Sequence, residues 1–427
     1  MERFTGLIGV VVILGIAFLL SNNRKAINYR LVASGLALQL GLAIFILKVP
    51  IGQQIFASLG TFVKDLLDFA DQGANFVFGV LVKKKEMTQV FGQENEFIFF
   101  FKIIPTIIFV AVLVSIAYHI GLMQRVVAFF ARIVYWLMGA SGSEALSNVA
   151  SAFVGQVEAQ IMIKPYLKGM TKSELLASMA GSMACIAGGV MAVYISFGIP
   201  AAYLIAASIM AAPGALVISK IVYPETEESE TKRKIQLEVQ KIHANLVDAI
   251  SHGAGDGLKV SLNVVAMLIG FIALIAMIDA GLGWIGRILA EYTSLSLNFI
   301  GIDLAKLSLK SILGAFFALF SWVMGVPSQD VYTAGSLLGT KIVVNEFVAY
   351  LDLTALMKSN SLQPKSIVIL SFALCGFANF SSIAIQVGGI GQLAPERRAD
   401  IASLGFKALI CGTLASYLSA TIAGMLF

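Results

Sequence analysis

Charged residues and cysteines are both scarce in this chain of 427 residues. Only 13% of the residues are charged, against roughly 25% in a soluble globular domain, and 58% are hydrophobic. All three cysteines lie inside apolar runs, and an odd count provides no disulfide framework. No basic stripe interleaved with aromatic residues is present, which argues against nucleic-acid binding despite the net charge of +5. The composition therefore predicts an integral membrane protein.

Catalytic and metal-ligand constellations are also missing from the sequence. No Ser/His, Cys/His or metal-ligand grouping has the spacing that an enzyme active site needs. His243 and His252 have no third ligand at metal spacing, so we interpret both as solvated loop residues. These absences predict that the protein is not an enzyme and uses no organic cofactor.

Long apolar runs make up much of the chain. They lie at residues 6–21, 31–49, 97–120, 178–199, 201–222, 260–282, 366–393 and 401–427. Most are close to the roughly 20 residues that a helix needs to cross the hydrocarbon core of a membrane. No small-x-small cleavage site follows the first run, which we interpret as a mature helix rather than a signal peptide. The expected fold class is an all-α polytopic membrane protein.

Basic residues near the ends of these runs indicate the orientation in the membrane. Arg24, Lys25 and Arg30 place the first loop in the cytoplasm, whereas the lysines at 83–85 fall in a loop that the same count places outside. Residues 224–259 form a polar connector that we expect on the cytoplasmic side.

Two parts of the chain resemble one another. The stretch "WLMGASGSEALSNVASAFVGQVEA" from Trp136 aligns with "WVMGVPSQDVYTAGSLLGTKIVVNEFVA" from Trp322 at an offset of 186 (322 − 136). The acids Glu158 and Glu346 follow at an offset of 188, and "MACIAGGVMA" aligns with "ALCGFANFSS" at 190. Three landmarks in the same order predict an internal repeat. If each unit crosses the membrane three times, the second is inverted relative to the first, as in secondary transporters.

Each repeat contains a polar interruption within apolar sequence. Gly155 and Gln156 break the first segment beside Glu158, and Asn345 and Glu346 occupy the matching place in the second. Backbone interruptions at membrane depth are tolerated only where protein or a water-filled cavity covers them. We therefore predict a re-entrant hairpin in each repeat, with Glu158 facing a cavity, and breaks at "CIAGGV" and "CGFANFSS" in the spans that follow.

These four interruptions are expected to meet in one polar pocket near the midplane. Its predicted lining is Gln156, Glu158, Glu346, Asn379, Ser381 and Ser382, with Phe377 and Phe380 beside them. Carboxylates and amides accept from vicinal hydroxyls, and aromatic faces cover flat rings, so this lining favours a neutral ligand with several donors. An intramembrane carboxylate costs roughly 2.5–3.5 kcal/mol or more and usually marks a pathway. Ser381 is equally well explained as an interhelical hydrogen-bonding group.

At these residues the sequence resembles the concentrative nucleoside transporter family, in particular bacterial nucleoside:cation symporters. "GQVEA", "NEFVAY" and "CGFANFSSIAI" match its hairpin and broken-helix motifs, and the likeness covers essentially the whole chain. The resemblance implies eight transmembrane helices with two re-entrant hairpins, a homotrimer in the cell (inner) membrane, and a nucleoside substrate. It also implies the site residues: Gly155, Gln156, Val157, Glu158 and Val190 around the nucleobase, Glu346, Asn379 and Ser382 at the ribose, and Phe377 lining the pocket.

Departures from the family's motifs concern the base and the coupling cation. Close members have "GQTEAP" where this chain has "GQVEAQ", so Val157 replaces a hydroxyl near the nucleobase and Gln160 replaces a proline. The implied sodium ligands are Ser151, Val154, Cys185 and Ile186, but the family has an Asn and a Ser where this chain has Ser151 and Cys185. Sodium prefers oxygen ligands, and a neutral thiol is a poor substitute. We therefore expect coupling to H+ rather than Na+, with Glu158 or Glu346 carrying the proton after burial has raised its pKa.

The chain is thereby expected to divide into five parts. These are N-terminal scaffold helices (1–121), a first transport repeat (122–223), a polar cytoplasmic linker (224–259), a scaffold span (260–300) and a second transport repeat (301–427). Each repeat holds an interfacial helix, a hairpin and two spans. The expected function is nucleoside import by cation symport through alternating access. The alternatives are a symporter of nucleobases or other polar neutral solutes on the same scaffold, an intramembrane hydrolase that uses the two carboxylates, and a channel.

Overall fold

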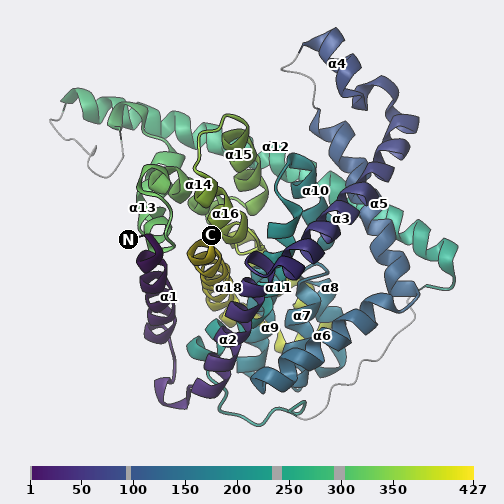
Figure 1. The fold of residues 1–427 in the computed structure, drawn as a ribbon, viewed down its shortest axis with the longest axis vertical. Helices are drawn as coiled ribbons and strands as arrows, with labels where there is room; N and C mark the ends of the chain where they lie inside the picture. The colour runs from purple at the N-terminus through teal and green to yellow at the C-terminus, as the bar shows by residue number, and fades with distance from the viewer. Residues whose placement is uncertain (1, 93–97, 233–242, 293–302) are drawn as a thin grey trace.

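A computed structural model describes residues 2–92, 98–232, 243–292 and 303–427 of the protein (Figure 1). Within these ranges most of the chain is helical and no β-strand is present, so the predicted all-α class is confirmed. The N-terminal part comprises α1 (Glu2–Leu19), η1 (Arg24–Ala26), α2 (Tyr29–Leu47), α3 (Pro50–Phe78), η2 (Gly79–Val82), α4 (Lys84–Phe91) and α5 (Phe99–His119).

Two series of helices with the same order follow. The first contains α6 (Leu122–Met138), α7 (Gly142–Ser151), α8 (Glu158–Ile161), η4 (Lys164–Tyr166), α9 (Lys172–Ala184), α10 (Gly188–Phe197) and α11 (Ala201–Val222). The second contains α13 (Leu309–Val323), η7 (Ser328–Asp330), α14 (Val331–Val343), α15 (Glu346–Lys358), α16 (Pro364–Ala373), α17 (Phe380–Leu393), η8 (Pro395–Arg397) and α18 (Arg398–Leu426). In each series a helical pair joined at its polar residues comes first (α7 and α8; α14 and α15). A broken helix follows (α9 and α10; α16 and α17), and then a long helix (α11; α18), as the internal repeat predicts.

Helix α12 (Leu246–Tyr292) separates the two series and begins earlier than expected. The predicted linker extended to residue 259, but the Asn245 side chain accepts the N–H of Asp248 at 2.9 Å and starts the helix there. Gly253 and Gly257, four residues apart, then pack on α5, where a Cβ would lie 2.8 Å and 2.7 Å from backbone Cα atoms. Small residues at this spacing let two helices approach closely. The second half of the linker prediction was therefore wrong; residues 233–242 and the predicted boundary at 300–301 lie outside the described residues.

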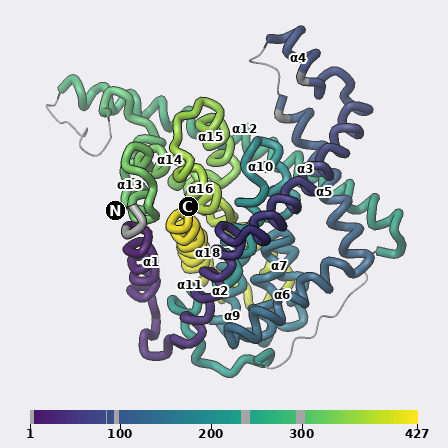
Figure 2. Tube along the Cα trace, in the orientation of Figure 1, coloured from purple at the N-terminus to yellow at the C-terminus, as the bar shows by residue number. Residues whose placement is uncertain are grey.

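Helix α18 occupies the middle of the bundle, whereas α12 projects from it on both sides (Figures 1 and 2). α18 packs against α1, α9, α11, α16 and α17, and 83% of its most apolar window is buried. Only 11% of the corresponding window of α12 is buried, and apolar side chains such as Ile269 and Met277 are 68% and 66% exposed. Such exposed apolar surface belongs in lipid or against other protein.

Six helical stretches of the described residues are long and apolar enough to cross a membrane. They are Tyr29–Leu47, Phe100–His119, Lys172–Phe197, Ala201–Val222, Leu246–Tyr292 and Pro395–Leu426. Shorter apolar helices lie at Thr5–Leu19, Leu309–Val323 and Pro364–Ala373. The chain is therefore a multi-pass membrane protein.

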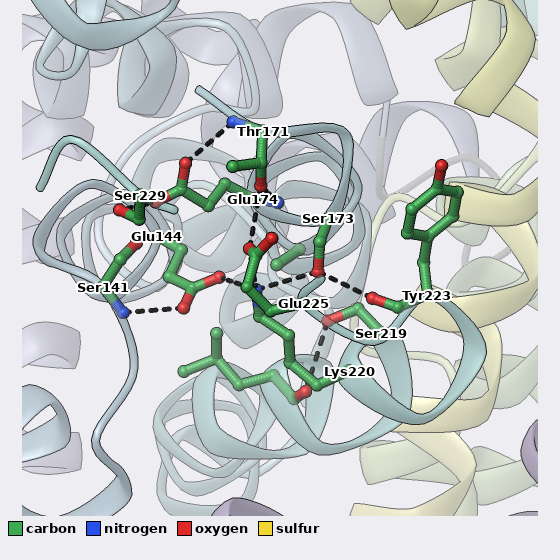
Figure 3. A network of polar contacts seen from close by, with 12 residues as sticks. Ser141, Glu144, Thr171, Ser173, Glu174, Ser219, Lys220, Tyr223, Glu225 and Ser229 are labelled. Atoms are coloured by element: carbon green, nitrogen blue, oxygen red, sulfur yellow. Dashed lines mark hydrogen bonds and ion pairs between the residues drawn. The ribbon is translucent and has the colours of Figure 1, made fainter. Parts of the chain in front are cut away.

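A buried ionic network fixes the starts of α7 and α9, the helices on either side of the first hairpin loop and α8, to the end of α11 (Figure 3). The Lys220 ammonium lies 2.7 Å from Glu144 Oε2 and 3.2 Å from Glu225 Oε2, and it donates to Ser173 Oγ at 2.9 Å. Glu144 also accepts the backbone N–H of Ser141 at 2.7 Å, which caps the start of α7. The lysine and Glu144 are almost fully buried.

A second carboxylate, Glu174, performs the same capping at the start of α9. Its Oε2 accepts the N–H of Thr171 at 2.9 Å, and the Thr171 hydroxyl accepts the N–H of Glu174 at 3.1 Å. The Thr171 hydroxyl in turn donates to Glu225 at 2.8 Å (Figure 3). The carboxylates that cap α7 and α9 thus share one buried region with a single ammonium.

We expect Lys220→Met to lower the free energy of unfolding by about 3–5 kcal/mol, because Glu144 would be left as an uncompensated buried charge. The measurement is the thermal unfolding of the detergent-solubilised protein. The matched control is Lys172→Met, which removes an exposed lysine 3.1 Å from Asp400 and should leave the free energy of unfolding nearly unchanged. Equal losses for the two variants would show that the buried network does not hold the hairpin.

Candidate functional site

The two broken helices cross at their breaks. The first break lies between α9 and α10 and the second between α16 and α17, as "CIAGGV" and "CGFANFSS" predicted. The N–H of Phe377 donates to the carbonyl of Cys185 at 3.3 Å. Gly376 precedes it with φ +122°, and a Cβ there would lie 2.6 Å from the carbonyl oxygen of Ala184. Only glycine combines this backbone conformation with such a close approach.

The N-termini of α15 and α17 are both capped by asparagine. The Asn345 side chain accepts the N–H of Val348 at 3.0 Å, and the Asn379 side chain accepts the N–H of Ser382 at 2.9 Å. Each cap satisfies a backbone donor that the helix itself leaves unpaired. The breaks thereby place two positive ends of helix dipoles next to one another at the site.

Glu346 is the first residue of α15 and is buried, with 5% of its surface exposed. Its carboxylate accepts from the Tyr194 hydroxyl at 3.1 Å and from Asn379 Nδ2 at 3.0 Å. These donors join the second hairpin, α14 and α15, to α10 and to the second break. The role of Tyr194 was not predictable from the sequence, because a single tyrosine within an apolar helix has no pattern that separates it from core residues.

A cavity of about 120 Å³, which we call the inner cavity, lies between these elements. Its lining includes the predicted residues Gln156, Val190, Glu346, Phe377, Asn379, Ser381 and Ser382, together with Asn345 and with Val264, Met267 and Leu268 of α12. The structure therefore brings the first hairpin, the second hairpin and the second break to one place, as expected. Asn345 Nδ2 is buried there with no hydrogen-bond partner among the described residues. A buried donor without a partner is costly unless a ligand or water satisfies it.

The remaining predicted residues of the first hairpin lie elsewhere. Glu158 is exposed and lines a second, larger cavity of about 600 Å³, which we call the outer cavity, together with Tyr118, Met162 and Lys168. Its carboxylate folds back on Gly155, where a Cβ would lie 2.1 Å from Glu158 Oε2. The prediction that both hairpin acids share one cavity is therefore wrong for this conformation, and so is the premise that Glu158 is buried.

Val157 was also predicted to face the substrate. Its methyl groups instead pack on Gly389 of α17, where a Cβ would lie 2.6 Å from Val157 Cγ2. Gln156, one residue earlier, faces the inner cavity and accepts from Gln386 Nε2 at 3.4 Å. The non-helical backbone between α7 and α8 explains the difference, since neighbouring side chains there follow no helical period.

The four predicted sodium ligands lie in two segments that touch. The N–H of Gly188 donates to the carbonyl of Phe153 at 3.2 Å, which joins the first break to the hairpin loop. Ser151, Val154, Cys185 and Ile186 are all buried. The Cys185 thiol is directed to the carbonyl of Ser208 at 3.7 Å, and the Cys185 carbonyl accepts from Phe377. The cysteine therefore offers no hard side-chain oxygen to a cation.

Ser151 is part of a continuous chain of hydrogen bonds that starts at Gln160. Gln160 Nε2 donates to Ser182 Oγ at 2.7 Å, Ser182 Oγ lies 3.0 Å from Ser151 Oγ, and Ser151 donates to the Ser147 carbonyl at 2.8 Å. Gln160 Oε1 accepts from Ser178 at 2.6 Å. Ser151 and Gln160, the two side chains that depart from the family's motifs in this segment, are thus linked by hydrogen bonds through Ser182.

The second repeat holds a lysine at the comparable place. Lys341 of α14 is fully buried, and its ammonium donates to the carbonyl of Ala373 at 2.8 Å and contacts that of Cys375 at 3.5 Å. Cys375 aligns with Cys185 in the repeat. The carbonyls of the second break therefore bind a side-chain cation.

Comparisons with known proteins agree over the full length. Residues 8–81 and 203–424 match the families described as Na+ dependent nucleoside transporter N-terminus and C-terminus, and residues 100–201 match "Nucleoside recognition". The chain is 42% identical to an uncharacterized transporter of Haemophilus influenzae, covering 100% of this chain and 98% of the relative. It is 37% identical to the nucleoside permease NupC of Helicobacter pylori, with 98% and 96% covered.

Solved structures of similar proteins show the same fold. CNTnw in an inward-facing substrate-bound state superposes with a TM-score of 0.91 at 40% identity, covering 100% of this chain and 98% of the other. These relatives are transporters and permeases, so the chain is not an enzyme.

We expect Gly376→Ala to separate the two breaks and to cost at least the roughly 1–3 kcal/mol of a strained backbone conformation. The free energy of unfolding and substrate uptake should both fall, because the added Cβ meets backbone rather than a movable side chain. The control is Gly388→Ala, since Gly388 lies in α17 with open space around its missing Cβ. A Gly376→Ala protein as stable and active as the control would contradict the crossing.

Proposed function

Because the chain belongs to the concentrative nucleoside transporter family, we propose that it is a secondary transporter that imports nucleosides by cation symport through alternating access. The observation that carries the proposal is the inner cavity around Glu346, which opens at two helix N-termini and two hairpin tips. A nucleoside is the neutral, hydroxyl-rich ligand that such a lining suits.

The polar groups of the inner cavity divide between the two parts of a nucleoside. The Glu346 carboxylate accepts from vicinal hydroxyls of a ribose, while Asn379 and Ser382 hold it from the next helix. Gln156 and Asn345 Nδ2 offer donors and acceptors to the heteroatoms of a base, and Phe377 covers its flat face. The carboxylate repels an anionic substrate, which excludes nucleotides.

The first hairpin lies between two cavities, which supports alternating access. Gln156 faces the inner cavity and Glu158, two residues later, faces the outer one. The inner cavity, at about 120 Å³, is smaller than the roughly 300–1,000 Å³ of most ligand sites. Substrate entry therefore requires the hairpin and the second break to move apart, and their return closes the site.

The proposal also specifies how the chain crosses the membrane. Adding α1 and the α16/α17 pair to the six long apolar helices gives eight crossings, with both hairpins re-entering from their own sides. The exposed apolar surface of α12 fits contact between protomers of a homotrimer as well as contact with lipid. We assign the protein to the cell (inner) membrane, where a cation gradient is available for import.

For the coupling cation we propose H+. Ser151 and Gln160 satisfy one another through Ser182, and the Cys185 thiol is directed to Ser208, so the place of the family's sodium site offers one side-chain oxygen, already hydrogen-bonded, where the family has two. A hard cation would have to rely mainly on backbone carbonyls and the Ser151 hydroxyl. Glu158, which faces the outer cavity, is the carboxylate best placed to exchange a proton with water.

Substituting Glu346→Gln should lower uridine affinity by about tenfold to a hundredfold, since charge-assisted hydrogen bonds contribute about 1.5–3 kcal/mol. The measurement is uptake of labelled uridine into proteoliposomes over a range of concentrations. Glu291→Gln, at the exposed end of α12, is the control for the carboxylate-to-amide change. Wild-type uridine affinity in Glu346→Gln would overturn the ribose assignment, and uptake of uracil in place of uridine would favour the nucleobase alternative.

Sodium and proton gradients imposed separately across the proteoliposome membrane test which cation is coupled to uridine uptake. We expect uridine uptake to persist without sodium, to rise as the external pH falls, and to collapse with a protonophore. Glu158→Gln should remove the pH dependence, and Ser151→Asn combined with Cys185→Ser should introduce a sodium dependence. Uptake by the native protein that starts only when sodium is added, at every pH, would show that backbone carbonyls suffice for the metal.

A further inference from the structure

All three histidines of the chain lie close together, and two of them, His243 and His252, line the outer cavity. The ring centroids of His119 and His243 are 6.4 Å apart, and those of His243 and His252 are 5.2 Å apart. Asp248, in the first turn of α12, lies between His243 and His252. The interpretation that His243 and His252 have no third ligand at metal spacing was wrong, because Asp248, one helical turn before His252, lies within 4.8 Å of both.

The hydrogen bonds of Ser115 determine the tautomer of His243. The Ser115 hydroxyl donates its only proton to the carbonyl of Ala249 at 2.7 Å. Its 3.2 Å contact with His243 Nε2 must therefore be a bond that the imidazole N–H donates. In the neutral ring this leaves the lone pair on Nδ1. Metal-ligating histidines are usually oriented in this way, by donating the other ring N–H to a neighbouring acceptor.

The freed lone pair of His243 points to a place where a cation is needed. His243 Nδ1 is buried, makes no hydrogen bond within the described residues, and lies 4.0 Å from Asp248 Oδ2. The other oxygen of Asp248 lies 3.6 Å from His252 Nε2. Both distances are too long for hydrogen bonds. The buried Nδ1 lone pair thus faces a carboxylate that is 36% exposed and whose Oδ2 accepts the N–H of Ala244 at 2.9 Å, and a cation between the two groups would satisfy both.

We propose that His243, Asp248 and His252 bind one divalent transition-metal ion, with zinc as the best fit. The three ligand atoms lie within 4.8 Å of one another, so small side-chain movements bring them to the roughly 2.0–2.2 Å that zinc requires. Two imidazoles and a carboxylate suit zinc, whereas magnesium and calcium prefer oxygen ligands throughout. Water takes the fourth position from the outer cavity, which His243 and His252 line and which gives the ion its path of entry.

The ion has a structural consequence. His243 precedes α12, Asp248 and His252 are on its first turns, and Ser115 belongs to α5. A bound metal therefore ties the chain before α12 to the helix start and, through the Ser115 hydrogen bond, to α5. This role is independent of which nucleoside or coupling cation the protein uses.

Direct metal titration tests the proposal. Tag-free, chelator-treated protein in detergent is titrated with zinc against a chromophoric chelator, and we expect one zinc ion per chain and no binding of magnesium. His252→Gln should weaken zinc binding at least tenfold, and Ser115→Ala should weaken it by roughly 10- to 100-fold through loss of the orienting hydrogen bond. Asp256→Asn changes an exposed carboxylate of the same cavity and should leave the affinity unchanged.

His252 is 63% exposed, so its substitution leaves folding intact and keeps the test decisive. X-ray absorption of the zinc complex should show only nitrogen and oxygen ligands at about 2.0–2.2 Å. Absence of stoichiometric zinc binding, or equal zinc affinity in the wild type and in the double variant His243→Ala with His252→Gln, would overturn the site. Thermal unfolding should shift upward with zinc in the wild type and in Asp256→Asn, but not in the double variant.

Discussion

The contact between the two helix breaks is the constraint on which the rest of the site depends. A helix interrupted at membrane depth exposes backbone groups that lipid cannot satisfy, so each break needs protein beside it. Here the breaks cover one another: the Phe377 N–H reaches the Cys185 carbonyl, and the absent side chain at Gly376 permits the approach. Once the breaks are joined, the start of α17 lies beside the start of α15, and Asn379 comes within hydrogen-bond distance of Glu346. The inner cavity is thus a by-product of satisfying two interruptions at once.

A closed network of hydrogen bonds joins the first hairpin to α9. The side chains of Gln160, Ser182 and Ser151 each find a partner in the next, and the chain ends on a helix carbonyl. Polar groups that satisfy one another do not require an ion to balance them, in contrast to converging oxygens with unshared electron pairs. At the C-terminal end of α11, Lys220 and three carboxylates form a network of the opposite kind, in which charge balance is obligatory (Figure 3).

Much of this arrangement was predictable because helix-breaking residues and acids are rare in apolar sequence and therefore visible. The two breaks, the hairpin tip at Glu346 and the cavity lining at Gln156 and Asn379 followed from such residues alone. Side-chain direction in irregular backbone did not, which is why Glu158 and Val157 were assigned to the wrong neighbours. Partners that arrive from distant helices also escaped prediction, since neither Tyr194 nor the Asp248 carboxylate between His243 and His252 has a periodic signature.

Lys341 gives the two repeats different electrostatic characters. Its ammonium rests on the carbonyls of the second break, in a position related by the repeat to the first break, where the family's resemblance implies a dissociable cation. A side chain cannot be diluted or carried away by the medium as a free ion can. The carbonyls of the second break therefore have a cationic partner that is part of the polypeptide itself. Two repeats with the same order of helices thus differ at their breaks, one of which carries its own ammonium group.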